Sequence, residues 1–204
     1  MPAIGFLFDE PVEETVTTSA PPVHGCGVHH DEHVRRGAPS TARLRIRPES
    51  VAEHSFRASV VASVLAALEG AEPQRAAFLA LWHDTQETRT TDRPHLAKRY
   101  VAAASNEAVT DDQVRPLPEP VAAMIRDAVA EYEAGQTPEA RCARDADKLE
   151  CLLQAREYAD QGHQNLQPWI DSSLASLRTA TAREIAAEAL TQNSLDWLAR
   201  ARQP

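Results

Sequence analysis

A helix start signal at residues 48–53, followed by an apolar run that ends at a glycine, most constrains what this chain can fold into. Ser50 and Glu53 have the spacing of a capping box, in which each side chain accepts a hydrogen bond from the other residue's backbone N–H. Apolar residues then recur at helical spacing, and they are Phe56, Val60, Val61, Val64, Leu65 and Leu68. Because glycine commonly ends helices, the pattern predicts a helix from about Ser50 to Gly70.

The rest of the chain shows further helical patterns and no sustained strand pattern. Pro73 opens a second apolar segment, and Thr137-Pro138 opens a long one that continues to about Gly162. Other helices are predicted around residues 96–104, 121–135, 169–177 and 185–190, and residues 105–118 are predicted to be a linker between halves of the bundle. Because no segment alternates apolar and polar residues for long, the sequence predicts an all-α fold.

Length and composition favour one globular domain with an N-terminal arm. A chain of 204 residues with 43% hydrophobic residues can bury one sizeable core. Residues 1–34 contain prolines and polar residues without a sustained period, which predicts a flexible arm, and residues 35–204 are predicted to form the domain. The three cysteines are an odd number without a Cys-x-x-Cys pair, which argues against a disulfide framework.

Charge and targeting signals limit the partners and the location. A formal net charge of −9 argues against a nucleic-acid surface, which would normally carry a basic stripe. No apolar stretch approaches the roughly 20 residues that cross a bilayer, and the N-terminus lacks a basic-then-apolar signal. We therefore expect a cytoplasmic protein with no membrane or nucleic-acid partner, and the sequence leaves a homodimer open.

Candidate metal ligands gather where the second apolar segment ends. His83 and Asp84 follow this run directly, and Glu87 returns to the face of His83 by the four-residue spacing. Each of these residues could also be an ordinary helix residue without a ligand role, since a lone His-Asp pair occurs often by chance. His54 in the first predicted helix and Asp147 in the long one favour a site, because side chains of this kind among apolar helices are costly without a partner. A shared ion would remove that cost.

Three motifs in this order resemble the branch of the HD-domain metal phosphohydrolases that contains the 5′-deoxynucleotidases. They are Pro48-Glu49-Ser50-Val51-Ala52-Glu53-His54-Ser55, His83-Asp84-x-x-Glu87-x4-Asp92-x-Pro94, and Asp145-Ala146-Asp147-Lys148-Leu149-Glu150 to Ala155-Arg156-Glu157-Tyr158. The resemblance covers about residues 45–160. It implies an HD-domain helical bundle and a phosphohydrolase that removes the 5′-phosphate of a nucleoside monophosphate, deoxy or otherwise sugar-modified.

The resemblance also implies roles for individual residues. In that family one divalent ion is held by the residues that match His54, His83, Asp84 and Asp147. Imidazole with carboxylate suits Mn²⁺, Co²⁺, Fe²⁺, Ni²⁺ or Zn²⁺ better than Ca²⁺. Glu87 would hold or deprotonate a water, and Asp92 would contact the sugar or protonate the departing oxygen.

The chain departs from the family pattern where relatives carry an arginine that binds the phosphate. The stretch Arg35–Arg43 lacks the tryptophan that accompanies this arginine, so Arg36 or Arg43 would take the role. Thr91 also replaces the glycine that commonly precedes the aspartate matching Asp92. Both changes lie where sugar and phosphate should be bound, so we expect a shift toward an unusual nucleotide.

Two alternatives remain open from the sequence. One is an HD phosphohydrolase that acts on nucleoside di- or triphosphates or on a cyclic dinucleotide. The other is a metal- or nucleotide-binding HD module without turnover, against which the intact Glu87 and Asp92 argue. Two-metal relatives need additional histidines between the His-Asp pair and the last aspartate, and only His95 lies there, which favours one ion.

Overall fold

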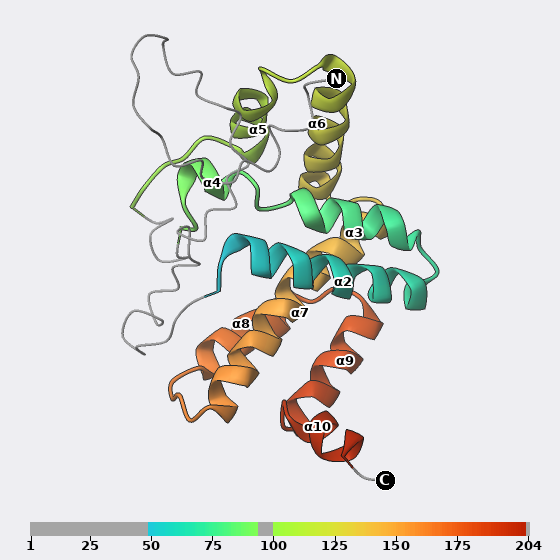
Figure 1. Ribbon diagram of the computed structural model, residues 1–204, viewed down its shortest axis with the longest axis vertical. Coiled ribbons are helices and arrows are strands. Elements are labelled where there is room, and N and C mark those ends of the chain that lie inside the picture. The colour runs from blue at the N-terminus through green and yellow to red at the C-terminus, as the bar shows by residue number, and fades with distance from the viewer. Residues whose placement is uncertain (1–48, 94–99, 203–204) are drawn as a thin grey trace, which may run out of the picture.

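The computed structural model describes residues 49–93 and 100–202, most of which lie in helices (Figure 1). The helices are α2 (Val51–Glu69), α3 (Pro73–Trp82), α4 (Glu87–Thr90), α5 (Asn106–Val114), α6 (Glu119–Ala134), α7 (Pro138–Asp160), α8 (Gln167–Ser176), α9 (Ala180–Thr191) and α10 (Asp196–Ala201). No β-strand occurs in the described ranges, which confirms the predicted all-α fold. The arm predicted at residues 1–34 lies outside them.

The start and the end of α2 follow the predicted signals. The Ser50 hydroxyl accepts a hydrogen bond from the Glu53 N–H at 3.1 Å, and the Glu53 carboxylate accepts one from the Ser50 N–H at 2.6 Å. Gly70 ends the helix at φ 72° and ψ 22°, a left-handed conformation that glycine adopts without a steric cost. This cap places His54 in the first turn of α2.

Helices α2, α3 and α7 pack on one another in the middle of the molecule (Figure 1). Much of the core between them consists of alanines with no exposed surface, namely Ala58, Ala62, Ala66, Ala76, Ala80, Ala143 and Ala146. Short side chains let helix axes approach closely. The larger buried apolar residues are Leu65, Leu79, Leu149 and Leu152, and burying each contributes roughly 1.5–3 kcal/mol. The close approach brings the polar residues of α2 and α7 into contact.

Most of the apolar residues that carry the period of α2 face away from this core. Phe56, Val60, Val64 and Leu68 are 70%, 49%, 50% and 62% exposed. The buried face consists mainly of smaller residues and one histidine, namely Val51, His54, Ser55, Ala58, Ala62, Leu65 and Ala66. The expectation that no apolar stretch is long enough to cross a bilayer is wrong for α2, whose 19 residues and mean hydropathy of 1.3 suffice by length and composition. Core helices of soluble proteins share this property.

The segment predicted to be a linker contains α5, so that prediction is wrong. Ser105 caps this helix, and Thr110, Gln113 and Val114 are its buried residues. The Gln86 side chain donates a hydrogen bond to Thr110 at 2.8 Å. Because Val114 is the one apolar residue among the three that α5 buries, hydrophobic periodicity did not reveal this helix.

The prediction of a helix around residues 96–104 is wrong for the part of this segment that the structure describes. Residues 101–105 are not helical, and residues 94–99 lie outside the described ranges. The next predicted helix, at residues 121–135, corresponds to α6. Ala122 and Ile125 of α6 form a small second apolar cluster with Val114, and Trp82 packs against it. This cluster connects α5 and α6 to the end of α3.

Helix α7 also anchors the C-terminal helices. The buried Asp145 carboxylate accepts hydrogen bonds from the Arg178 N–H at 2.9 Å and the Thr179 N–H at 2.7 Å, directly before α9 begins. Figure 1 shows α8, α9 and α10 at the end of the molecule opposite α5 and α6. The long α7 therefore contacts α6 at one end of the molecule and α8 and α9 at the other.

Candidate metal centre

Three separate segments bring the four predicted ligands together. His54 lies in the first turn of α2, His83 follows the last residue of α3, and Asp84 lies in the turn after it. Asp147 lies in the middle of α7. His54 has no exposed surface, and His83 and Asp147 are only 2% and 6% exposed. The packing of α2 and α3 on α7 is thus what assembles the cluster.

The ligand-type atoms of the cluster lie close to one another. His54 Nε2 lies 3.2 Å from His83 Nε2 and 3.4 Å from oxygens of both Asp84 and Asp147. His83 Nε2 lies 3.1 Å from Asp84 Oδ2 and 3.8 Å from Asp147 Oδ1. All four side chains offer an atom within 4.8 Å of every other.

The outer nitrogens of both imidazoles are hydrogen-bonded away from the cluster. His54 Nδ1 bonds Glu150 Oε2 at 2.6 Å, and His83 Nδ1 bonds the Ala80 carbonyl at 2.6 Å. Because both partners are acceptors, each Nδ1 carries a proton, and Nε2 is the atom that each ring directs into the cluster. Two neutral rings would then face each other with lone pairs 3.2 Å apart, an arrangement that needs a cation between them.

The donor set fits a divalent ion in composition and spacing. Atoms bonded to one ion at about 2.1 Å lie about 3.0 Å apart at a right angle and about 3.4 Å apart at a tetrahedral angle. The separations of 3.1–3.8 Å between nitrogens and oxygens of the cluster are close to these values. Two imidazoles with two carboxylates suit a transition-metal ion rather than an oxygen-only Ca²⁺ site.

The carboxylates perturb the titration of the cluster. Burial lowers the pKa of His83, but Asp84 and Asp147 outweigh this effect and raise it from 6.5 to about 10. Burial raises the pKa of Asp147, but Lys148 and the two histidines hold it well below 3.8. In the metal-free protein, positive charge at His83 and Lys148 thus compensates the buried carboxylates.

Sequence reasoning gave no role to three residues that contact the predicted ligands. Lys148 Nζ lies 2.7 Å from Asp147 Oδ2, and the Tyr132 hydroxyl donates to the same oxygen at 3.4 Å. The third is Glu150, which bonds His54. The spacing of Asp147 and Glu150 on one helix was a usable signal, because residues three apart share a helix face. No local signal linked Tyr132 on α6 to the cluster.

The predicted catalytic carboxylates lie on the segment that follows the cluster. Glu87 begins α4, and its N–H donates to the Asp84 carbonyl at 2.9 Å, which ties it one turn from the ligands. Asp92 follows Thr91, whose φ of 59° and ψ of 154° belong to a region that is essentially restricted to glycine. The glycine common at this position in the resembled family would adopt that conformation without strain, whereas the β-branched Thr91 does so at a cost of about 1–3 kcal/mol.

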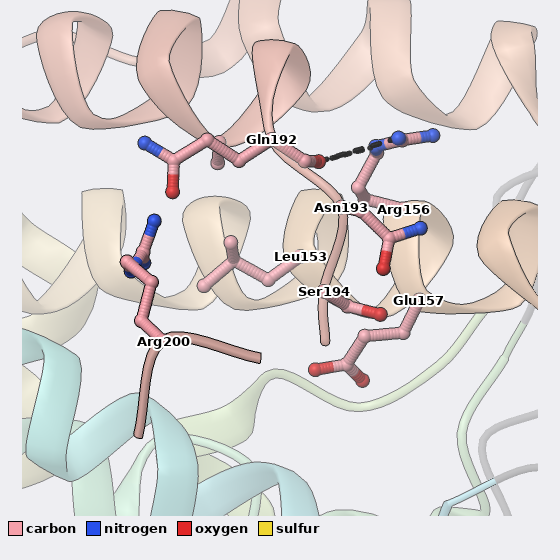
Figure 2. Close-up of a pocket in the computed structure, with 8 residues that line it drawn as sticks. Leu153, Arg156, Glu157, Gln192, Asn193, Ser194 and Arg200 are labelled. Carbon is pink, nitrogen blue, oxygen red and sulfur yellow. Dashed lines mark hydrogen bonds between the residues drawn. The ribbon is translucent and has the colours of Figure 1, made fainter. Parts of the chain in front are cut away.

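The predicted phosphate-binding residues Arg36 and Arg43 lie outside the described residues. A pocket of about 230 Å³ lies elsewhere, between α7 and the segment that joins α9 to α10 (Figure 2). Arg156 at its wall donates to the Gln192 carbonyl at 3.2 Å. None of the residues that line this pocket is a predicted site residue, so it is separate from the candidate metal centre.

Comparison with known proteins agrees with this geometry. Residues 32–189 match the HD domain family. The 5′-deoxynucleotidase HDDC2 of Homo sapiens is 29% identical over 163 residues, which cover 78% of this chain and 79% of that protein. HDDC2 of Dictyostelium discoideum is 33% identical over 141 residues, which cover 62% and 74%. The solved PH0347 protein of Pyrococcus horikoshii superimposes with a TM-score of 0.62 at 26% identity, covering 77% of this chain and 91% of that one. The chain therefore belongs to the HD domain family.

Proposed function

We propose that this protein is a metal-dependent phosphohydrolase that removes the 5′-phosphate of a nucleoside monophosphate and releases nucleoside and inorganic phosphate. The observation that carries the proposal is the cluster of two imidazoles and two carboxylates, three of them buried, contributed by α2, the end of α3 with the turn after it, and α7. Relatives in the HD domain family are named 5′-deoxynucleotidases, which supports a nucleotide as the substrate.

His54, His83, Asp84 and Asp147 would hold one divalent ion, with Mn²⁺, Co²⁺, Fe²⁺, Ni²⁺ and Zn²⁺ as the candidates. When bound, such an ion supplies positive charge for the phosphate and lowers the pKa of a coordinated water. The four side chains would hold the ion from one side, and the burial of His54, His83 and Asp147 would exclude bulk solvent from that side.

The remaining residues would bind the substrate and move protons. Glu87 would orient or deprotonate the attacking water, and Asp92 would contact the sugar or protonate the departing oxygen. Arg36 or Arg43 would bind the phosphate as charge-assisted donors. Lys148, whose ammonium lies 2.7 Å from Asp147, would add positive charge at the same edge of the site.

A monophosphate suits this chain better than a triphosphate. A terminal phosphate carries about two negative charges, which one ion and one or two cationic side chains can balance. A triphosphate would bring roughly twice that charge. The chain has a net charge of −9 and shows no Gly-rich phosphate loop in its sequence, so it offers little to receive the extra charge.

Phosphate release from 5′-mono-, di- and triphosphates of the same nucleosides, in ribo and deoxy forms and with each candidate metal, tests the proposal. We expect turnover of 5′-monophosphates, and Glu87→Gln should keep the metal but lose about 10²–10⁴-fold in rate, as expected for a general base. A preference for triphosphates, or pyrophosphate or tripolyphosphate as product, would overturn the proposed reaction. Near wild-type turnover in Glu87→Gln would remove Glu87 from the mechanism.

The proposal extends to the organisation and location of the chain. We propose a single domain at residues 35–204, for which the family match over residues 32–189 is the support, and an arm at residues 1–34. We propose a cytoplasmic enzyme that works on a small-molecule nucleotide without a nucleic-acid or membrane partner, in line with its acidic charge.

A further inference from the structure

Glu150 lies beside the metal centre without being one of its four proposed ligands. Its side chain has no exposed surface, and its two oxygens have different partners. Oε2 bonds His54 Nδ1 at 2.6 Å, whereas Oε1 accepts from Arg57 Nε at 2.8 Å and from Arg57 Nη2 at 2.5 Å. The carboxylate therefore connects a guanidinium to the rear nitrogen of a ligand imidazole.

Arg57 is itself held in one orientation. Its Nη1 donates to both oxygens of Glu157 at 2.9 Å, and its Nη2 donates to Gln154 Oε1 at 2.9 Å. A guanidinium bonded through all three nitrogens has a fixed plane. Because a buried carboxylate is costly without a compensating charge, Arg57 lets Glu150 remain beside His54 as an anion.

The two helices repeat one arrangement. Arg57 follows His54 by three residues on α2, and Glu150 follows Asp147 by three residues on α7. Residues three apart lie on the same helix face, so each helix presents one ligand together with one supporting residue. The contact between α2 and α7 then brings His54 close to Asp147, and one helical turn further along it brings Arg57 close to Glu150.

We propose that Glu150, oriented by Arg57, is a positioning residue that fixes the His54 ring with its Nδ1–H bound and its Nε2 directed at the metal centre. The inference rests on the metal site of the proposed function. A carboxylate in this place sets the tautomer and the orientation of a ligand histidine, and losing it typically costs 10–100-fold in metal affinity. His83 has the Ala80 backbone carbonyl as the corresponding partner, so the test falls on Glu150.

Titration of metal-free protein with Co²⁺ in a calorimeter measures the effect. Glu150→Gln keeps the shape and should weaken binding about tenfold, and Glu150→Ala should weaken it about 100-fold. The matched control is Asp145→Asn, another buried carboxylate on α7, which bonds the start of α9 rather than a ligand. This control should melt at a lower temperature yet bind Co²⁺ within about twofold of wild type. Wild-type affinity in both Glu150 variants, or an equal loss in Asp145→Asn, would overturn the positioning role.

Proton NMR of the metal-free proteins, labelled with ¹⁵N-histidine, gives a readout independent of metal and turnover. A short bond from His54 Nδ1–H to a carboxylate should give a downfield proton resonance in wild type and in Asp145→Asn, and Glu150→Ala should lose it. Persistence of the resonance in Glu150→Ala overturns the proposal. If wild type shows the Glu150-dependent resonance but hydrolyses no nucleotide, the proposed function fails while the positioning role stands.

Discussion

His83 is a main source of positive charge in the candidate metal centre when no ion is bound. Its ring is 2% exposed, and its Nε2 faces both carboxylates of the cluster. Asp84 and Asp147 raise its pKa to about 10 in spite of burial, so a proton on Nε2 serves as the cation in the metal-free protein. A divalent ion and this proton compete for the same nitrogen, since a metal ligand must be deprotonated.

Metal binding should therefore release about one proton per chain at pH 8, because His83 is protonated below its raised pKa of about 10. Calorimetric titration in two buffers with different ionisation enthalpies measures the released proton. Without metal, the folded-state pKa lies above the unfolded value of 6.5, so His83 contributes stability that is full below pH 6.5 and is lost toward pH 10. Metal uptake without proton release would contradict this charge assignment.

At the scale of one element, α2 has two apolar faces with different roles. One face packs small residues and Leu65 against α3 and α7. The other carries Phe56, Val60, Val64 and Leu68, all of them at least 49% exposed. The size of the apolar side chains alone therefore does not identify which face of α2 lies in the core. Close packing of three helices favours alanine and serine over larger side chains.

Substitution on the two faces of α2 should have unequal effects on stability. Leu65→Ala should lower the free energy of unfolding by about 2–5 kcal/mol, since Leu65 has no exposed surface. Phe56→Ala is the matched control, and at 70% exposure it should change stability by only about 0.5 kcal/mol. Urea unfolding followed by circular dichroism compares them. A larger loss for Phe56→Ala would show that the outward face of α2 is covered in solution.

At the scale of the whole molecule, the candidate metal centre joins segments that are distant in sequence. α2, the end of α3 and α7 each contribute to it, and α7 continues to the contacts that hold α8 and α9. An ion bound there would act as a cross-link in the centre of the bundle. The satellite cluster of α5 and α6 is connected to the same region through Trp82.

Adding metal should therefore raise the melting temperature of the metal-free protein. Binding to the native state at a free ion concentration of 100 times the dissociation constant contributes about 2.7 kcal/mol. For a domain of this size that corresponds to roughly 5–11 °C. Differential scanning calorimetry with and without Co²⁺ checks this value. Asp147→Ala is the control, and an equal rise in this variant would show that the ion binds elsewhere.

The sequence by itself determined the elements with strong local signals and the residue types of the site. The capping box at Ser50 and Gly70 set the two ends of α2, and Thr137-Pro138 set the start of α7, because capping acts within a few residues of the chain. The His83-Asp84 pair, with His54 and Asp147, followed from motif order and from the cost of burying such groups in an apolar setting.

Only the tertiary structure decided how these elements face one another. α5 is held by hydrogen bonds with the turn after α3 and by the packing of Val114 on α6, and the buried face of α2 depends on how closely α3 and α7 approach. Glu150 meets His54 and Arg57 across 96 and 93 residues of chain. Periodicity and motifs describe neighbours along the sequence, whereas these contacts depend on helix axes, which are set by the packing of the whole core.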